Sequence, residues 1–117
     1  MAIPSGSGTE VLKVYTTTVA GGSGEQNAIV GVANHIYTVL SIIICNVSSS
    51  DDEMFTIFID DDGSTQTNLT KETPVAAKST FVWSDKFVLS GTDCLRIVPE
   101  SAASFHIVCS YIDQDWS

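Results

Sequence analysis

The sequence is poor in positive charge. Only five Lys and Arg residues stand against 14 Asp and Glu residues, which gives a formal net charge of −9. Binding to DNA or RNA requires clustered Lys and Arg side chains that neutralise phosphates. The composition therefore disfavours nucleic acid as a direct partner.

Long apolar segments are also lacking. No window approaches the roughly 20 consecutive apolar residues of a membrane-spanning helix. Residues 1–10, MAIPSGSGTE, have neither the cationic start nor the apolar run of a secretory signal. We therefore expect a soluble protein that is made in a cytoplasm and has no membrane partner.

Cysteine is scarce and odd in number, with Cys45, Cys94 and Cys109 as the whole set. Each lies in an apolar, alternating segment, which is typical of buried, reduced thiols rather than of a disulfide framework. A chain of 117 residues buries roughly two-thirds of the surface that its unfolded form exposes. Stability therefore requires no metal or disulfide, and we expect no cofactor.

Helical periodicity is absent as well. Segments of period-two alternation, rich in Val, Ile, Thr and aromatic residues, recur between clusters of Gly, Asp, Ser and Pro. This pattern predicts an all-β fold, an antiparallel two-sheet β-sandwich of about eight strands with a jelly-roll or Ig-like order. The expected strands are 10–18, 35–46, 53–60, 65–71, 79–83, 86–89, 93–99 and 104–113.

The chain divides into a flexible N-terminal arm, residues 1–9, and a single sandwich domain, residues 10–117. Within the domain, residues 19–34 form a long connection with four glycines. Both segments are able to order against neighbouring subunits in an assembly. The candidate interface residues in them are Ile3, Pro4, Ile29 and Val30.

Two apolar segments also suggest a contact surface. Residues 36–45, IYTVLSIIIC, predict a central strand that is covered on both faces or that lines a subunit contact. In the segment 53–60, alternation places Phe55, Ile57 and Ile59 on one face and Met54, Thr56 and Phe58 on the other. Met54 and Phe58 are therefore candidate interface residues.

The acidic triplet Asp60–Asp62 follows the apolar residues of the segment FTIFIDDDGS. In an EF-hand loop aligned on Gly63, Phe58 occupies the position of the first acid and Leu69 that of the final Glu, so the pattern fails. A looser Ca²⁺ site between loops stays open as an alternative. An Asp-Gly pair between alternating segments indicates a tight turn, and we predict a hairpin tip without a metal.

No catalytic motif is complete. Residues 21–24, GGSG, approach the nucleophile elbow Gly-x-Ser-x-Gly, but Glu25 stands in the place of the closing Gly. The segment also lacks the Lys-Ser/Thr of a phosphate-binding loop. His35 and His106 lack the paired spacing of a zinc site. We predict a protein that is not an enzyme and has no catalytic or metal-binding residues.

The two tryptophans allow two interpretations. Trp116 lies one residue from the C-terminus of the sequence and is a candidate anchor onto a neighbouring subunit, whereas Trp83 is typical of a core or an interface. If either gathers with Asp60–Asp62 on one exposed face, the alternative is a carbohydrate-binding module, with or without Ca²⁺.

The order of motifs between residues 36 and 113 points to a family. The motifs are Cys45-Asn46 after an apolar strand, FTIFI before an acidic turn, an aromatic strand ending at Trp83, the turn Ser90-Gly91-Thr92-Asp93, the strand Leu95–Val98, the small-residue turn Ser101-Ala102-Ala103 and a closing strand. This order resembles the small β-sandwich virion proteins of tailed bacteriophages, which include capsid decoration (cement) proteins and head-neck or tail accessory subunits.

The resemblance implies a structural role through repeated protein contacts and offers no catalytic residues. We therefore expect a homotrimeric decoration or cement protein that binds the major capsid protein, or other virion proteins, and stabilises the shell. Its expected location is the outer surface of the virion, after assembly in the host cytoplasm. A head-neck or tail accessory protein is the alternative within the same class.

Overall fold

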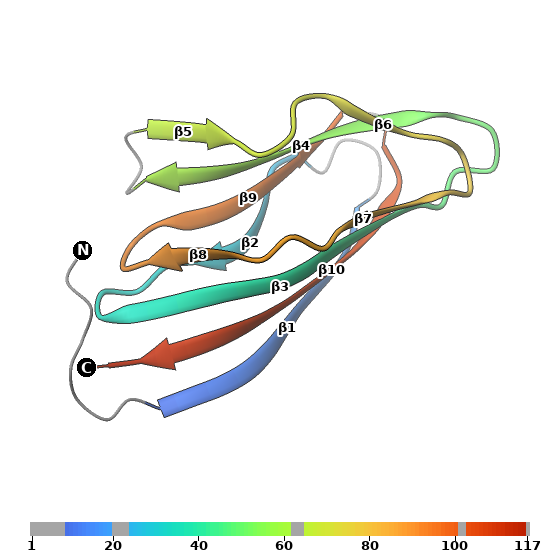
Figure 1. Ribbon diagram of the computed structural model, residues 1–117. Coiled ribbons are helices and arrows are strands. Elements are labelled where there is room, and N and C mark those ends of the chain that lie inside the picture. The colour runs from blue at the N-terminus through green and yellow to red at the C-terminus, as the bar shows by residue number, and fades with distance from the viewer. Residues whose placement is uncertain (1–8, 20–23, 62–64, 101–102, 117) are drawn as a thin grey trace.

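Two antiparallel sheets form a sandwich in the computed structural model, which describes residues 9–19, 24–61, 65–100 and 103–116 (Figure 1). Sheet A has the order β1-β10-β3-β7, with β8 also paired to β3. Its strands are β1 (Thr9–Val19), β3 (His35–Asn46), β7 (Thr80–Trp83), β8 (Phe87–Ser90) and β10 (Phe105–Asp115). Sheet B has the order β2-β9-β4-β5, with β6 also paired to β4. Its strands are β2 (Gln26–Val30), β4 (Glu53–Asp61), β5 (Thr65–Asn68), β6 (Thr73–Val75) and β9 (Cys94–Pro99).

The ten strands occupy eight positions, because two positions are each shared by two short strands. β7 pairs with one half of β3 and β8 with the other half, and β5 and β6 divide β4 in the same way. Most connections cross from one sheet to the other, which is the order of an eight-position jelly roll. The predicted antiparallel two-sheet sandwich is thus confirmed. No helix of the described residues is long and apolar enough to span a membrane.

The prediction of one long connection over residues 19–34 is wrong, since this segment contains β2. β2 has only five residues, of which Ala28 and Ile29 are buried, and a register irregularity interrupts its pairing with β9. So short and irregular a strand leaves little alternation to detect. β6 was missed for a related reason, because its three residues include a proline, Pro74. The predicted arm, residues 1–9, lies outside the described residues except for Thr9, which begins β1.

The core lies between the sheets and is made of the inward row of each strand. Phe55 of β4 packs against Phe81 of β7 and Phe105 of β10, with ring centroids 4.8 and 6.2 Å apart. Complete burial of one such side chain stabilises the fold by about 1.5–3 kcal/mol. Because these rings come from both sheets, they hold the two layers together.

Asn46 closes the end of β3 and is fully buried. Its Nδ2 donates hydrogen bonds of 2.9 Å to the carbonyl oxygens of Asp51 and Val75, and its Oδ1 accepts one of 3.0 Å from the N–H of Ser48. A buried amide is tolerated when its donors and acceptor are all bonded. Asn46 therefore fixes the β3–β4 turn against β6 of the opposite sheet.

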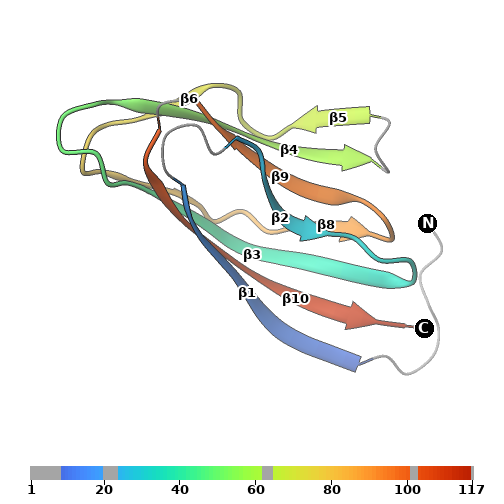
Figure 2. The ribbon, with the colours of Figure 1, turned by 180° about the vertical axis from the view of Figure 1, so that it is seen from behind.

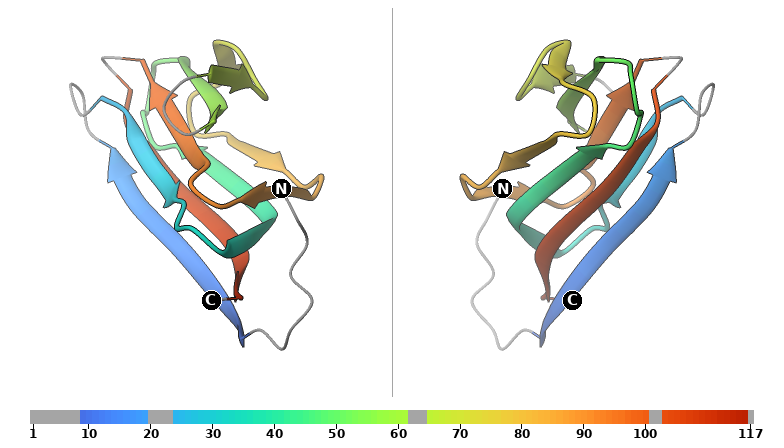
Figure 3. Two further views of the ribbon diagram at one scale, coloured as in Figure 1. Left: turned by 90° about the vertical axis from the view of Figure 1, so that its left-hand side faces the viewer. Right: turned by 90° about the vertical axis from the view of Figure 1, so that its right-hand side faces the viewer.

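At the other end of the sandwich, two turns touch. A Cβ atom placed on Gly31 would lie 2.2 Å from the carbonyl oxygen of Asp93 and 2.3 Å from that of Gly91. The β2–β3 and β8–β9 connections therefore approach each other so closely that only glycine fits. Seen from behind and along the sandwich, β1 lies at the free edge of sheet A, next to β10 (Figures 2 and 3).

Candidate interaction surface

The side of sheet A that points away from sheet B carries apolar side chains interspersed with Ser and Thr, and no other described segment covers it. Period-two alternation turns one row of each strand inward and leaves the other row outside. We call this outer surface the outer A face. Its apolar members are Leu12, Val14, Ile36, Leu40, Ile43, Val82, Val88, Val108 and Ile112. Four of them, Leu12, Val14, Val82 and Val88, are 57–72% exposed.

Charge is almost absent from the outer A face. Apart from the thiol of Cys45, the outward row of the described residues in these five strands contains only Glu10, at one corner, and His106 as ionisable groups. Glu10 Oε1 accepts a hydrogen bond of 2.8 Å from Nε2 of Gln114. In a chain with a net charge of −9, a sheet face with so few charges stands out from the rest of the surface. Apolar patches of this kind mark contact sites in soluble proteins.

A β-bulge hollows the middle of the outer A face. Ser110 of β10 pairs with Ser41 of β3, but the next residue, Tyr111, pairs with Val39, so Leu40 is an extra residue in β3. Bulges bend a strand and redirect its side chains. The groove that results is lined by Leu12, Lys13, Val14, Leu40, Ser41 and Ser110.

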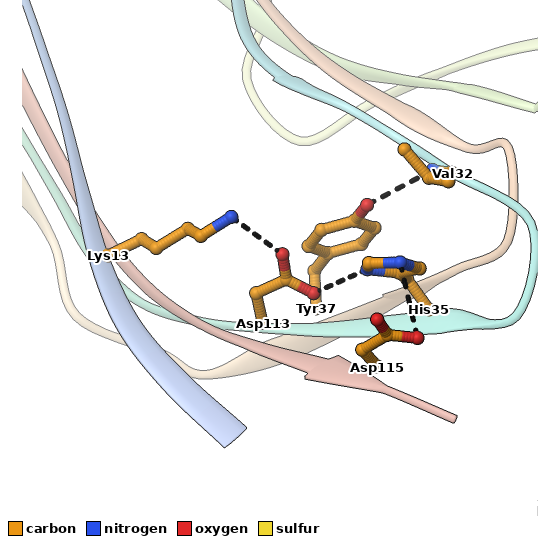
Figure 4. Close-up of polar contacts among 6 residues, drawn as sticks. All are labelled: Lys13, Val32, His35, Tyr37, Asp113 and Asp115. Atoms are coloured by element: carbon orange, nitrogen blue, oxygen red, sulfur yellow. Dashed lines mark hydrogen bonds and ion pairs between the residues drawn. The ribbon is translucent and has the colours of Figure 1, made fainter. Parts of the chain in front are cut away.

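A cluster of charged side chains lies on the inner side of sheet A, at the end where the chain enters β1 (Figure 4). Asp113 Oδ2 lies 2.9 Å from Nζ of Lys13, and Asp113 Oδ1 lies 2.7 Å from Nδ1 of His35. His35 Nε2 lies 3.5 Å from Oδ1 of Asp115. These contacts join β1, β10 and β3 through their side chains.

Two tyrosines pack beside this cluster. Tyr37 OH accepts a hydrogen bond of 3.0 Å from the N–H of Val32, and the Tyr37 ring stacks on His35 and meets the edge of Tyr111. Burial raises the pKa of both Tyr37 and Tyr111. Both phenols are therefore neutral near pH 7 and form the apolar wall of the cluster.

The charged side chains of the cluster change each other's pKa values. The hydrogen bond that Lys13 donates to Asp113, together with the charge of that carboxylate, raises the pKa of Lys13. Burial acts to raise the pKa of Asp113, but the hydrogen bonds and charges of Lys13 and His35 outweigh it and lower that pKa. Near neutral pH, Lys13 is protonated and Asp113 is ionised, so the two side chains form an ion pair.

The residues predicted as an interface do not form one surface. Ile3 and Pro4 lie outside the described residues. Ile29 and Phe58 are 3% and 4% exposed, so they offer no accessible surface to a partner. Val30 of β2 and Met54 of β4 are exposed, but they belong to sheet B. Phe58 does point away from the main core, yet its own chain covers it, with Arg96 and Asn68 as its neighbours across the ladder.

Trp116 is partly buried against its own sandwich instead of being free. Its backbone N–H donates a hydrogen bond of 2.9 Å to the carbonyl oxygen of Asn34, and its buried indole nitrogen has no hydrogen-bond partner among the described residues. Trp83 points inward, packs edge-on against Phe87 and donates from its indole N–H to the carbonyl oxygen of Asp85. Neither ring is presented as a flat platform for a sugar.

The acidic segment at the end of β4 forms part of a hairpin, because β4 pairs directly with β5. Asp60 is 8% exposed and binds Nη1 of Arg96, whose Nε lies 3.4 Å from Glu25. Asp62 lies outside the described residues. Among the residues that the structure does describe, no group of three His, Cys, Asp or Glu side chains is placed to hold a metal ion.

Sequence reasoning missed the outer A face as a whole, although part of its signal was visible. The apolar segment 36–45 predicted either complete burial or a subunit contact, and its outward residues Ile36, Leu40 and Ile43 do belong to the face. The contribution of Leu12 and Val14, which extend the face onto β1, was not foreseen.

No protein-family model matches the chain, and a search of curated proteins finds no match. Among solved structures, the fold is similar to a chain from Bacillus endospore appendages, described as forming a novel family of disulfide-linked pili. That similarity has a TM-score of 0.57 at 19% sequence identity and covers 100% of this chain and 97% of the other. A chain from the structure of infectious bursal disease virus, strain Gx, has a TM-score of 0.48 at 12% identity, over 89% of this chain and 32% of the viral chain. At these identities, the similarity concerns the fold.

Proposed function

We propose that this protein is a non-enzymatic structural subunit of a multi-subunit assembly and that it contacts its neighbours through the outer A face. The observation that carries the proposal is the near absence of charge on this apolar face of an otherwise acidic chain. Two copies of a strongly acidic protein repel each other wherever carboxylates meet. Two copies that meet through the outer A face bring few carboxylates together and so avoid most of this repulsion.

The size of the face suits a protein contact. Four strand positions about 4.8 Å apart and strands of about 11 residues at roughly 3.3 Å each give an area of about 500–700 Å². A standard interface buries about 800 Å² on each partner. The outer A face therefore supplies most of a stable contact, and the groove at Leu40 offers a recess for an apolar side chain.

The specific assembly that we propose is a phage virion, with this protein as a decoration subunit on the outer surface of the capsid, as its motif order suggests. A trimer, or another closed ring, would repeat the weak contacts over a lattice. Binding of the purified protein to assembled capsids, and its presence in virions in stoichiometric copies, would support this role. Failure of both measurements would exclude it.

A subunit of a surface appendage is the second candidate. It is favoured by the similarity to the Bacillus appendage chain, which extends over nearly the full length of both chains. Filaments in negative-stain electron microscopy of the concentrated protein would favour this candidate, whereas discrete closed particles would favour decoration of a capsid.

The association that we propose is not a covalent one. The appendages are described as disulfide-linked, but Cys94 and Cys109 are buried here, and Cys45 is only partly exposed. A disulfide between subunits requires thiols that reach each other across the contact. We therefore expect assemblies of this protein to survive a reducing agent.

The test of the outer A face uses three valines of similar exposure. Val82 and Val88 lie on the face and are 57% and 58% exposed, whereas Val30 lies on β2 of the other sheet and is 62% exposed. Val82→Asp and Val88→Asp should reduce the size of the oligomer in sedimentation velocity, and Val30→Asp should not. A wild-type protein that is monomeric at high concentration, or equal behaviour of all three variants, would refute the role of the face.

A further inference from the structure

β1 is the longest strand at an edge of either sheet in the described part of the chain. It has 11 residues, from Thr9 to Val19, and its ladder with β10 runs without a bulge. No strand of the described residues pairs with its other side. A long, regular edge presents rows of N–H and C=O groups that another strand can pair with.

The remaining edges are short or interrupted. β7 and β8 have four residues each, β2 has five, and β5 and β6 have four and three. Short edge strands are one of the means by which natural sheets avoid pairing with other chains. β1 lacks this protection, and it contains neither Pro nor Gly.

Charge does not protect β1 either. Its two charged residues are Glu10 and Lys13, and both are engaged by side chains of β10. Lys13 binds Asp113 on the inner side of the sheet, and Glu10 binds Gln114 on the outer side. A Lys that points outward from an edge repels an approaching strand, but Lys13 is held against its own neighbour.

Symmetry restricts how a second copy can pair with this edge. In an antiparallel pair, opposite residues point to the same face of the sheet. A two-fold axis perpendicular to the sheet therefore passes between two copies of one residue. If the axis lies at Lys13, the ammonium groups of the two Lys13 side chains stand opposite each other. If it lies at Leu12, Thr9 pairs with Tyr15, and the rest of β1 stays unpaired. An axis at Val14 pairs Thr9 with Val19 and so uses the whole of β1.

We propose that two copies of this chain join β1 to β1, antiparallel about a two-fold axis at Val14, so that the two A sheets form one continuous sheet. In this register, Leu12 of one copy lies opposite Thr16 of the other, and Lys13 lies opposite Tyr15. No like charges face each other. Main-chain hydrogen bonds supply the contact, as in other cases of strand addition.

This pairing goes beyond the proposed function, because its contact is the main-chain edge of β1 and does not require the outer A face to be covered. The axis is perpendicular to the sheet, so both outer A faces lie on the same side of the pair. The pair then presents a continuous apolar surface of twice the area to a further neighbour.

Cysteine substitutions test the register directly. In a Cys45→Ser background, which removes the partly exposed native thiol, Val14→Cys places two thiols opposite each other at the axis. At about 10 µM protein, thiols held at an effective concentration near a millimolar should cross-link roughly 100-fold faster than by chance collision. Val30→Cys, which is equally exposed on β2, is the matched control and should cross-link slowly.

A mixed experiment sharpens the test. Leu12→Cys and Thr16→Cys should each fail to cross-link alone, because their copies lie far apart in this register, but a mixture of the two should form the heterodimer. Slow cross-linking of Val14→Cys, no faster than that of Val30→Cys, would overturn the pairing. Self-cross-linking of Leu12→Cys would place the axis elsewhere and would overturn the register.

Charge exchange provides an independent measurement. Val14→Asp and Val14→Lys each place like charges at the axis and should raise the dissociation constant of the pair roughly tenfold or more, and an equal mixture should restore it. If the mixture remains monomeric, the side chains do not meet and the proposal fails. Because Val14 also lies on the outer A face, both the cross-linking and the charge exchange are repeated with Val82→Asp, which disrupts the outer A face and leaves β1 unchanged.

Discussion

His35 and Asp113 face each other diagonally across β3 and β10, with Nδ1 of His35 2.7 Å from Oδ1 of Asp113. Asp113 is also bound by Lys13 from β1, so one buried carboxylate joins the side chains of three strands. Asp113→Asn removes the negative charge and replaces one carboxylate oxygen by an amide NH2 group, so the side chain cannot accept hydrogen bonds from both Lys13 and His35. We expect this variant to lose roughly 1–3 kcal/mol of unfolding free energy near pH 7, measured by urea denaturation.

The pH dependence of this effect has a defined sign. The pKa of Asp113 in the folded protein is lowered, so the carboxylate stabilises the fold above the ordinary Asp pKa of about 3.9. That stabilisation is lost as the pH falls through the folded value. The difference in melting temperature between wild type and Asp113→Asn should therefore shrink below about pH 4. A difference that stays constant down to the acid transition would show that Asp113 acts through packing alone.

Glu53 has the opposite behaviour. It is buried at the start of β4, and burial, a hydrogen bond with Glu100 and the charges of Glu100, Asp51 and Asp52 raise its pKa. A raised folded pKa gives a stabilisation that is complete below the unfolded value and lost as the pH rises through the folded value. Glu53→Gln should therefore raise the melting temperature at pH 7 and have little effect near pH 4. Glu72→Gln, an exposed change near the same end of sheet B, serves as the control.

Position 31 requires glycine because neighbouring carbonyl oxygens leave no room for a Cβ atom, and not because of its backbone conformation. Gly31→Ala would place a methyl group against two carbonyl oxygens, and neither can move without shifting the β8–β9 turn. Overpacking of this kind costs typically about 1–3 kcal/mol. Gly24→Ala is the comparison, because nothing lies within 4 Å of its Cβ and only its positive φ is strained. A smaller loss of stability in Gly31→Ala than in Gly24→Ala would contradict the close approach of the two turns.

The three cysteines should differ in reactivity. Burial raises the pKa of Cys109 to about 12, so the reactive thiolate is scarce at neutral pH. Cys45 is partly exposed at the end of β3. We expect iodoacetamide to modify Cys45 first and to leave Cys109 unmodified until the protein unfolds, as mass spectrometry of digested protein would record. Early modification of Cys109 would indicate that the core opens in the native state.

The sandwich was predictable because its core is encoded by local alternation. Phe55, Ile57 and the inward residues of β3 on either side of its bulge are set by the period of two. Cys94 and Cys109 are buried as expected, whereas Cys45 is only partly buried. β2 was not predictable, since two buried residues among polar ones give no periodic signal. Its place in the sheet depends on β9, which follows more than 60 residues later in the sequence.

The candidate surface was harder to predict for a different reason. Phe58 and Ile43 look alike in the sequence, because each is an apolar residue in the outward row of a central strand. Phe58 is covered by its own chain, whereas Ile43 opens onto the outer A face. The difference depends on whether the fold places another segment over that side of the sheet, and no local pattern contains this information.

The two edges of sheet A are unequal, and this asymmetry limits how far the sheet can elongate. On one side β1 offers 11 consecutive residues, while on the other β7 and β8 offer two short stretches separated by residues 84–86. Once two copies have joined through β1, the combined sheet ends on both sides in interrupted edges. Strand addition therefore stops at two chains, which protects a protein with so much β-structure from growing into an amyloid-like ladder.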